Sequence, residues 1–345
     1  MTMLKNRNSA LTMPKTARVM VAGPTGQNLA PLNGSWSYTW QGADESAYPE
    51  STLTIYEALV DKLGDENVVL AGAEGFENPV NYDARALPAL ADSVDYVVLA
   101  LGERSYAESP GALDDLNLDP RQKALARAVA GRGKPVIFVL AQGRPRIIRD
   151  IEPLADGILL AYRPGSQGAR AIADVLTGDH NPSGVLPFSY PQYTGDQLPY
   201  DHGVLASVQQ LVPGNLTYEG YKPQWPFGHG LSYTKIEYEN LELSDKTLAA
   251  GEELEVSVRV RNTGQRDGAH IVELYISDLY ASLSPAARKL RAFEKVYLEA
   301  GKATTVRFKL GEDDLSFVNL DLQRVTEPGD FTVRVGPLTA TFRYE

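Results

Sequence analysis

The sequence has 345 residues, a length that usually forms about two domains. Its formal net charge of −11 disfavours nucleic acids and anionic membranes as partners, because both bind basic surfaces. The lack of cysteine excludes disulfides and thiolate chemistry, and the four scattered histidines do not have the spacing of metal ligands. No apolar run approaches the roughly 20 residues of a membrane span.

The first half of the chain alternates between strand-like and helix-like segments. Residues 1–16 are polar and irregular, and we expect an inter-domain linker there. Strands are then predicted at 17–24, 67–71, 95–101, 134–140 and 155–162, and helices at 51–63, 87–93, 121–130 and 167–176. Ser51 or Thr52 is the expected N-cap of the first helix. The alternation predicts an α/β domain over 17–190, with a mostly parallel sheet flanked by helices.

The pattern changes in the second half. Proline, glycine and tyrosine accumulate over 191–232, which we interpret as a connecting segment. After residue 233 the apolar residues alternate with a period of two, most clearly at 254–262, 304–310 and 331–336. Residues 233–345 are therefore predicted to form an all-β sandwich of the size of an immunoglobulin-like or fibronectin-like module.

Two loops of the α/β domain carry residues that suit ligand binding. Gly23-Pro24-Thr25-Gly26 follows a strand, but it lacks the spacing of a nucleotide-binding loop, so a structural turn is the favoured interpretation. Trp36 and Trp40 lie in the glycine-rich segment GSWSYTWQG at 34–42. Their flat apolar rings suit stacking on a sugar, and core packing is the alternative.

The buried strand at 95–101 ends at a glycine and leads into a loop with two carboxylates, Glu103 and Glu108. Open α/β sheets place ligands at such strand ends. Paired carboxylates are the groups that glycoside hydrolysis needs, as acid/base and as nucleophile. Ordinary surface acids are the alternative, and the sequence alone does not show which second carboxylate faces which.

At these residues the chain resembles the C-terminal half of family 3 glycoside hydrolases, which include β-glucosidases and β-xylosidases. The resemblance covers nearly the whole chain. It is carried, in order, by GSWSYTWQG at 34–42, GERSYAE at 102–108, PGSQG at 164–168, LTGD at 176–179, PSGVLP at 182–187, FGHGLSY at 227–233, VRNTG at 260–264 and EPGDF at 327–331.

The resemblance implies a fold and a set of site residues. It predicts an α/β sandwich domain followed by a fibronectin type III-like domain. It implies that Glu108 is the general acid/base and that Trp40, with Trp36, walls the subsite beyond the cleaved bond. Glu103 matches a family position but receives no catalytic step. The family's reaction is retaining, uses β-linked glucosides or oligosaccharides and needs no cofactor.

The family's nucleophile is an aspartate in an N-terminal (β/α)₈ barrel, and no residue here matches it. We therefore expect an acid/base-bearing portion of a retaining β-glucosidase-like enzyme, inactive without a barrel supplied in cis or in trans. A catalytically silent carbohydrate-binding or scaffolding protein is the alternative. Residues 1–8 lack the apolar segment of a signal peptide, whereas full-length relatives are often periplasmic or secreted, so the localisation is left open.

Overall fold

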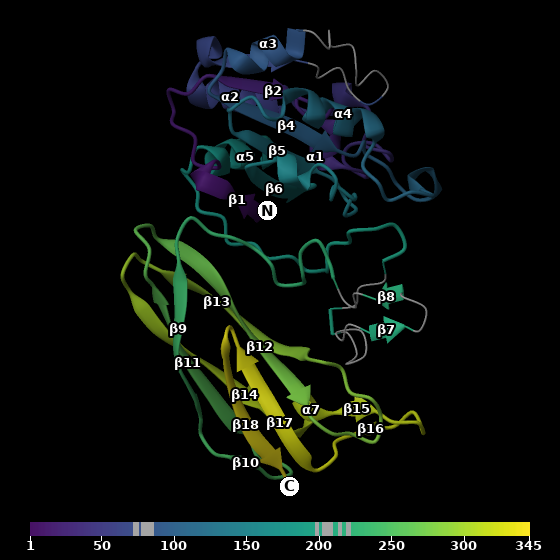
Figure 1. The fold of residues 1–345 in the computed structure, drawn as a ribbon, viewed down its shortest axis with the longest axis vertical. Helices are drawn as coiled ribbons and strands as arrows, with labels where there is room; N and C mark the ends of the chain where they lie inside the picture. The colour runs from purple at the N-terminus through teal and green to yellow at the C-terminus, as the bar shows by residue number, and fades with distance from the viewer. Residues whose placement is uncertain (72–75, 77–85, 197–199, 202–209, 213–215, 219–221) are drawn as a thin grey trace. The chain divides into compact units, whose positions relative to one another are not determined.

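A computed structural model describes residues 1–71, 76, 86–196, 200–201, 210–212, 216–218 and 222–345 (Figure 1). Contacts between residues divide the chain into two units. The first comprises Met1–Leu186, Tyr190–Gln197 and Gly228–Leu231, and the second comprises Pro187–Ser189, Leu198–Phe227 and Ser232–Glu345. Much of the predicted connecting segment at 191–232 lies outside the described residues.

The first unit is built on a six-stranded sheet in the order β1-β6-β5-β4-β2-β3. β1 pairs antiparallel with its neighbour, and the other neighbouring strands pair parallel. The strands are β1 (Thr2–Asn6), β2 (Val19–Ala22), β3 (Val68–Ala71), β4 (Tyr96–Gly102), β5 (Val136–Ala141) and β6 (Gly157–Tyr162). β5 is buried along its whole length, as expected for a strand of a parallel sheet that is covered on both faces.

Helices flank this sheet in two pairs, with α2 packed beside α5 and α3 beside α4 (Figure 1). The helices are α1 (Ala30–Asn33), α2 (Ile55–Leu63), α3 (Ala86–Asp92), α4 (Pro120–Val129) and α5 (Gly168–Leu176). Short 3-10 helices occur at Arg7–Ser9, Glu45–Ala47, Asp65–Asn67, Ser109–Gly111 and Glu152–Leu154. The predicted α/β class with a mostly parallel sheet is confirmed.

Two local predictions in this unit are wrong. The irregular linker expected over 1–16 begins instead with β1, because Met3 and Leu4 are buried and the strand pairs with β6. The N-cap of α2 is Thr54 rather than Ser51 or Thr52. Thr54 accepts a hydrogen bond from the Glu57 amide, and the Glu57 carboxylate accepts one from the Thr54 amide, so the two residues form a capping box.

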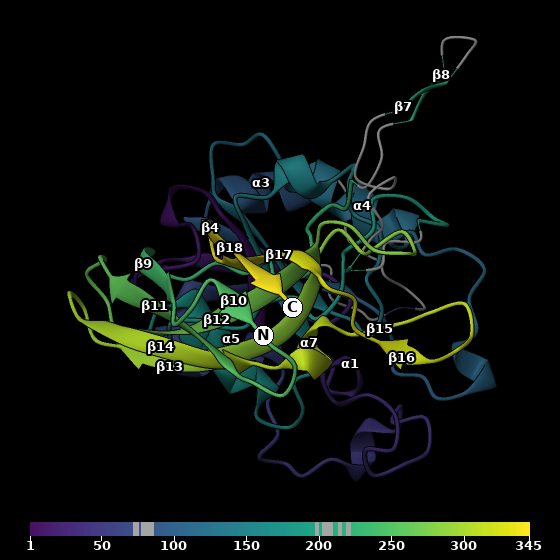
Figure 2. The same cartoon turned by 90° about the horizontal axis from the view of Figure 1, so that it is seen from below.

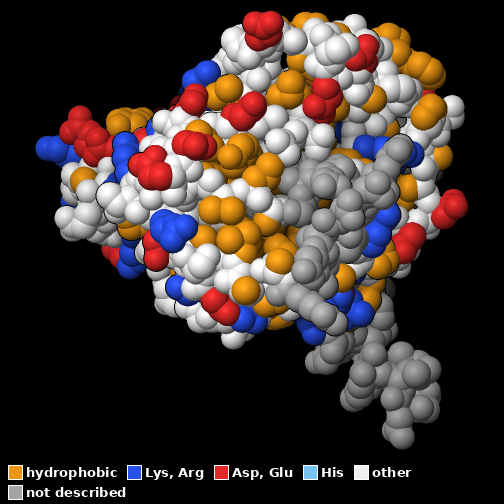
Figure 3. All heavy atoms as spheres, turned by 90° about the horizontal axis from the view of Figure 1, so that it is seen from above, with side chains coloured by type: hydrophobic (Ala, Val, Ile, Leu, Met, Phe, Trp, Pro, Cys, Tyr) orange, Lys and Arg blue, Asp and Glu red, His pale blue; other side chains and the backbone are white. Residues whose placement is uncertain are grey.

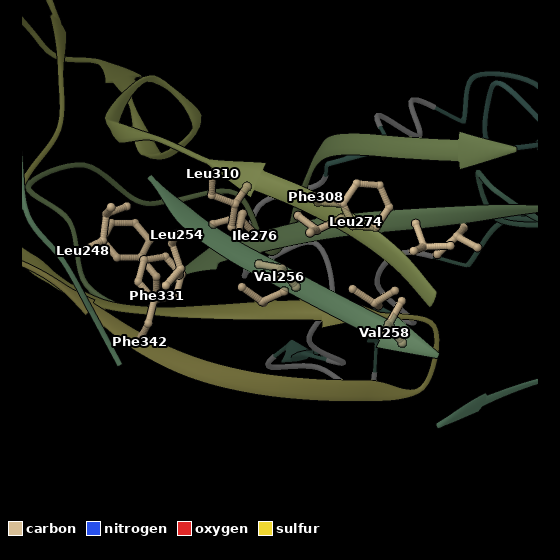
Figure 4. Close-up of a cluster of buried hydrophobic side chains, with 14 of the residues drawn as sticks. Leu248, Leu254, Val256, Val258, Leu274, Ile276, Phe308, Leu310, Phe331 and Phe342 are labelled. Atoms are coloured by element: carbon tan, nitrogen blue, oxygen red, sulfur yellow. The ribbon is translucent and has the colours of Figure 1, made fainter. Parts of the chain in front are cut away.

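The second unit is an all-β sandwich, which confirms the predicted change of fold class. A five-stranded sheet, β10-β18-β17-β12-β13, faces a three-stranded sheet, β14-β11-β9. The strands are β9 (Ile236–Leu243), β10 (Thr247–Leu248), β11 (Leu254–Asn262), β12 (Gly268–Asp278), β13 (Lys289–Leu298), β14 (Ala303–Leu310), β17 (Gly329–Val335) and β18 (Leu338–Tyr344). Alternate residues of β11, among them Val256 and Val258, point into the core between the sheets (Figure 4).

Smaller elements complete this unit. The one-turn helix α7 (Glu312–Leu315) lies next to a two-stranded hairpin of β15 (Phe317–Val318) and β16 (Arg324–Val325), which extends away from the sandwich (Figures 1 and 2). A second hairpin pairs β7 (Gln210–Val212) with β8 (Leu216–Tyr218). Among the described helices, none combines the length and the apolar character that crossing a membrane requires.

Candidate active site

The candidate site lies at the carboxyl ends of β2 and β4, which are neighbours in the sheet. From β2 the chain continues to β3 on one side, and β4 lies on the other side, so the order of the strands reverses at this point. Open α/β sheets bind ligands in the crevice that such a reversal creates. β2 leads into the segment that contains Trp36 and Trp40, and β4 leads into the segment that contains Glu103 and Glu108.

The turn directly after β2 is structural. The Thr25 amide donates to the Ala100 carbonyl at 3.2 Å, and the Gly26 amide donates to the Gly23 carbonyl at 3.1 Å. A Cβ atom on Gly23 would lie 2.3 Å from the Ala100 oxygen, so this glycine allows the turn to approach β4 closely. These contacts occupy the amides that a phosphate would need, which agrees with the interpretation as a turn.

Residues 34–42, here called the aromatic loop, present their rings to solvent. Trp36 is 71% exposed and Trp40 is 45% exposed, so neither is a core residue. The Trp36 amide donates to the Trp40 carbonyl at 2.9 Å, which closes the loop on itself. Trp36 and Tyr38 have positive φ angles of 57° and 62°, a conformation that is unfavourable for aromatic residues. The loop therefore holds its aromatic residues outward at the expense of local strain.

Residues 102–111, here called the acid loop, contain two glutamates in different environments. Glu103 is only 4% exposed. Its Oε2 accepts hydrogen bonds from the amides of Gly143 and Arg144, both at 3.0 Å. Its Oε1 accepts from the guanidinium groups of Arg144 and Arg146 at 3.0 and 2.7 Å. With both oxygens occupied and paired to two cations, Glu103 joins the acid loop to the end of β5.

Glu108 is exposed, and its carboxylate forms no hydrogen bond or ion pair with any described residue. Its backbone has φ 51° and ψ −140°, a region that glycine adopts freely and that costs other residues about 1–3 kcal/mol. The Glu108 carbonyl accepts from the Gly111 amide at 2.9 Å. The carboxylate is therefore free to act on a ligand while its backbone is held in a strained conformation.

A glutamine connects the two loops. The Gln41 Oε1 accepts from the Ala107 amide at 2.9 Å, and the Gln41 Nε2 donates to the Ala107 carbonyl at 3.3 Å. Gln41 comes directly after Trp40 and Ala107 directly before Glu108 in the sequence, so these two hydrogen bonds bring the predicted sugar-stacking and acid/base residues to the same region. Gln41 was not among the predicted site residues, although it lies within the motif at 34–42.

Two arginine side chains also contact the acid loop. Arg163, just after β6, donates to the Pro31 carbonyl and to the Arg104 carbonyl, both at 2.7 Å. Its guanidinium lies 5.0 Å from the centre of the Tyr106 ring. Arg144 lies on the same ring at 3.9 Å. Neither arginine was predicted as a site residue, and the only signal for them in the sequence is their position after strands β5 and β6.

A cavity of about 640 Å³ lies between the two loops. Its lining includes Gln41 of the aromatic loop, Arg104 and Tyr106 of the acid loop, and Glu45. Trp40 and Glu108 are not among its lining residues.

In the described part of the chain, no three histidine, aspartate or glutamate side chains gather as metal ligands. On the face drawn in Figure 3, acidic and basic side chains are interspersed among hydrophobic ones.

Comparison with known proteins assigns both halves of the chain. Residues 1–233 match the glycosyl hydrolase family 3 C-terminal domain, and residues 270–338 match a fibronectin type III-like domain. A lysosomal β-glucosidase of Dictyostelium discoideum is 35% identical over 97% of this chain and 42% of its own length. A periplasmic β-glucosidase of Salmonella typhimurium is 31% identical over 97% of this chain and 46% of its own length.

Solved structures show the same partial coverage. Two structures of a β-glucosidase from Listeria innocua, one with glucose and one of a mutant with laminaribiose, are each 31% identical to this chain, with a TM-score of 0.86. They cover 99% and 100% of this chain, which in turn covers 48% of each. The chain thus spans about half the length of the relatives it matches. Because the family match extends over 1–233, we conclude that this chain belongs to glycosyl hydrolase family 3 and carries its C-terminal domain.

Proposed function

We propose that this chain supplies the acid/base carboxyl and an aromatic wall of a retaining β-glycosidase active site, with Glu108 as the general acid/base and Trp40, with Trp36, contacting the sugar or aglycone beyond the cleaved bond. The observation that carries the proposal is the contrast between the two glutamates of the acid loop. Both carboxylate oxygens of Glu103 accept hydrogen bonds, whereas the Glu108 carboxylate has no partner among the described residues and lies on a strained backbone. Strain of this kind concentrates at functional sites.

In this mechanism the carboxylic acid of Glu108 donates its proton to the glycosidic oxygen as the bond to the anomeric carbon breaks. A carboxylate nucleophile from a barrel domain bonds to that carbon, which gives a covalent glycosyl intermediate. The Glu108 carboxylate then takes a proton from water as the water oxygen displaces the nucleophile. The two carboxyl groups must lie about 5 Å apart for this retaining course.

The proposed substrates are β-linked glucosides. The glucose and laminaribiose bound in the Listeria innocua structures support this choice, together with the exposed rings of Trp36 and Trp40. A planar indole offers an apolar surface with a polar edge, which suits a sugar ring whose faces carry C–H groups. The barrel would bind the sugar on the other side of the cleaved bond and would belong to the same polypeptide or to a second one.

The test is an assay of the purified chain on β-glucosides, alone and with a separately expressed family 3 barrel domain. We expect no more than trace hydrolysis by the chain alone. A general acid contributes about 10²–10⁴-fold, whereas enzymes usually accelerate reactions at least about 10⁶-fold. With the barrel, turnover should appear, and Glu108→Gln should remove most of it for unactivated glucosides and less for aryl glucosides with good leaving groups.

Two results would contradict this proposal. Robust hydrolysis by the chain alone that survives Glu108→Gln would show that another group is the acid. No turnover with the barrel, together with disaccharide binding that changes the tryptophan fluorescence and is lost in Trp36→Ala or Trp40→Ala, would instead support a silent carbohydrate-binding role. Trp40→Ala should weaken that binding in either case.

A further inference from the structure

Both ends of the segment between Gly102 and Glu108 are held by a glutamine side chain. At the start, the Gln122 amide accepts from the Gly102 N–H at 2.8 Å and donates to the Gly102 carbonyl at 2.9 Å. At the end, Gln41 contacts the N–H and the carbonyl of Ala107 in the same manner, at 2.9 and 3.3 Å. We call this second pair of hydrogen bonds the Gln41 bridge. Gln122 holds the residue before Glu103, whereas Gln41 holds the residue before Glu108.

The Gln41 bridge acts on the peptide plane that sets the φ angle of Glu108. The Ala107 carbonyl belongs to the peptide group that joins Ala107 to Glu108, so fixing this carbonyl fixes the plane on one side of the Glu108 Cα. The Glu108 carbonyl, which belongs to the next peptide group, accepts from the Gly111 amide at 2.9 Å and fixes the plane on the other side. The φ and ψ angles of 51° and −140° describe how these two planes are set.

The Gln41 bridge also connects this strained residue to the aromatic loop. Gln41 directly follows Trp40, whose carbonyl accepts from the Trp36 amide at 2.9 Å. The amide side chain of glutamine is suited to this position because it offers a donor and an acceptor side by side, matching the N–H and the carbonyl of one residue. A carboxylate could accept a hydrogen bond from the Ala107 N–H but could not donate one to the Ala107 carbonyl.

We propose that Gln41 is a positioning residue, whose side-chain amide holds Glu108 in its strained conformation and fixes it relative to Trp40. The importance of this positioning for catalysis rests on the function proposed above. The mechanical claim does not, since it concerns only the backbone on either side of Glu108.

The test is amide hydrogen exchange of Ala107 in the full chain, under conditions where exchange reports local opening. Gln41→Met keeps the length of the side chain and removes both hydrogen bonds, and it should speed exchange of the Ala107 amide at least tenfold. Gln41→Glu keeps an acceptor for that amide and should restore part of the protection. Gln122→Met is the matched control, and it should release the Gly102 amide without affecting Ala107.

A double-mutant cycle with Glu108→Gly separates positioning from simple filling of space. Glycine adopts the φ and ψ angles of residue 108 without strain, so Glu108→Gly should stabilise the closed loop and slow exchange of the Ala107 amide. This slowing should be larger when Gln41 is present, because the Gln41 bridge imposes those angles. Because strain of this kind is about 1–3 kcal/mol, we expect Glu108→Gly to slow exchange at least about fivefold more in the Gln41 background than in Gln41→Met. The added flexibility of glycine acts in both backgrounds and cancels.

Equal effects of Glu108→Gly in the two backgrounds, or equal exchange in Gln41→Met and Gln41→Glu, would overturn the proposal. If Gln41→Met does not fold, Gln41→Asn replaces it in the same cycle, because a side chain one methylene shorter does not reach both groups of Ala107. No step of this experiment needs turnover. Failure of the Glu108 activity assay therefore contradicts the proposed function but not the role of Gln41. Failure of the exchange experiment contradicts the role of Gln41 but not the proposed function.

Discussion

At the scale of single residues, Glu103 and Glu108 show how one loop separates a structural carboxylate from an available one. The acid loop leaves β4 at Gly102, where a Cβ atom would lie 1.9 Å from the Ala141 oxygen, so the chain passes very close to the end of β5. This close approach brings Glu103 to Arg144 and Arg146. Five residues later the loop has reached the surface, and Glu108 meets no cation among the described residues.

The two glutamates should therefore differ in their effect on stability. Glu103→Ala leaves Arg144 and Arg146 without their shared partner, and removing one member of a buried ion pair costs about 3–5 kcal/mol. We expect a clear fall in the melting temperature of the α/β unit, measured by calorimetry. Glu108→Ala is the matched control in the same loop and should leave that temperature nearly unchanged. Equal effects of the two substitutions would contradict the roles assigned to them.

The sequence predicted part of this site and not the rest. Trp36, Trp40 and Glu108 were found because they lie within short motifs, and their catalytic and binding roles stay predictions. The partners of Glu103 could not be predicted, since Arg144 and Arg146 lie 41 and 43 positions further along the chain. The strain at Glu108 could not be predicted either, because a glutamate gives no sign of a backbone conformation that normally requires glycine.

At the scale of elements, continuous apolar runs predicted β4, β5 and β6 well, because strands buried on both faces leave a strong signal. The alternating pattern of β11 was equally clear. β1 was missed because only Met3 and Leu4 in it are strongly apolar and the residues around them are polar. The start of α2 was misplaced although Thr54 and Glu57 have the spacing of a capping box, so this error was avoidable.

The cap of α2 gives a prediction at this scale. Thr54→Ala removes the oxygen that accepts from the Glu57 amide at 3.2 Å, and losing such a cap costs about 1 kcal/mol. Ser51→Ala, at the position first expected to cap the helix, should cost much less. Chemical denaturation of the two variants, followed by circular dichroism, measures the difference. A larger loss in Ser51→Ala would mean that the helix begins earlier than Ile55.

At the scale of the whole molecule, a unit with a mostly parallel sheet and an all-β sandwich are encoded one after the other in the same chain. The domain limits at 190 and 232 stay predictions, whereas residues 2–6 belong to the sheet of the first unit. The first unit nevertheless draws on a distant part of the sequence, because Gly228–Leu231 belongs to it. The Leu231 amide donates to the Met3 carbonyl at 2.8 Å, and His229 contacts the Leu4 carbonyl at 2.9 Å.

This attachment should depend on pH. Burial lowers the pKa of His229 below its usual value of 6.5, in spite of the hydrogen bond to Leu4, which raises it. The unfolded chain therefore takes up the proton first, so stability is complete above about pH 6.5 and falls as the pH decreases below that value. Burial lowers the pKa of His270 in the sandwich as well, with the same sign.

Melting temperatures measured between pH 8 and pH 5 test this expectation. His229→Gln keeps a side chain that can donate to the Leu4 carbonyl and cannot take up a proton, so it should reduce the loss of stability on acidification. His180→Gln is the control, since His180 is exposed. An identical pH dependence in the His229→Gln variant and the unmodified chain would contradict the assignment.

The position of β1 affects how this domain can be shortened without harm. The strand covers one edge of β6, whose residues Ile158, Leu159 and Leu160 are all buried. A version of the domain that started at residue 17, where the alternating pattern begins, would leave a row of unpaired backbone groups along an apolar strand. Open edges of this kind join between molecules and cause aggregation. We therefore expect residues 2–6 to prevent aggregation by covering this edge, and a domain limit chosen from hydrophobic periodicity alone would remove them.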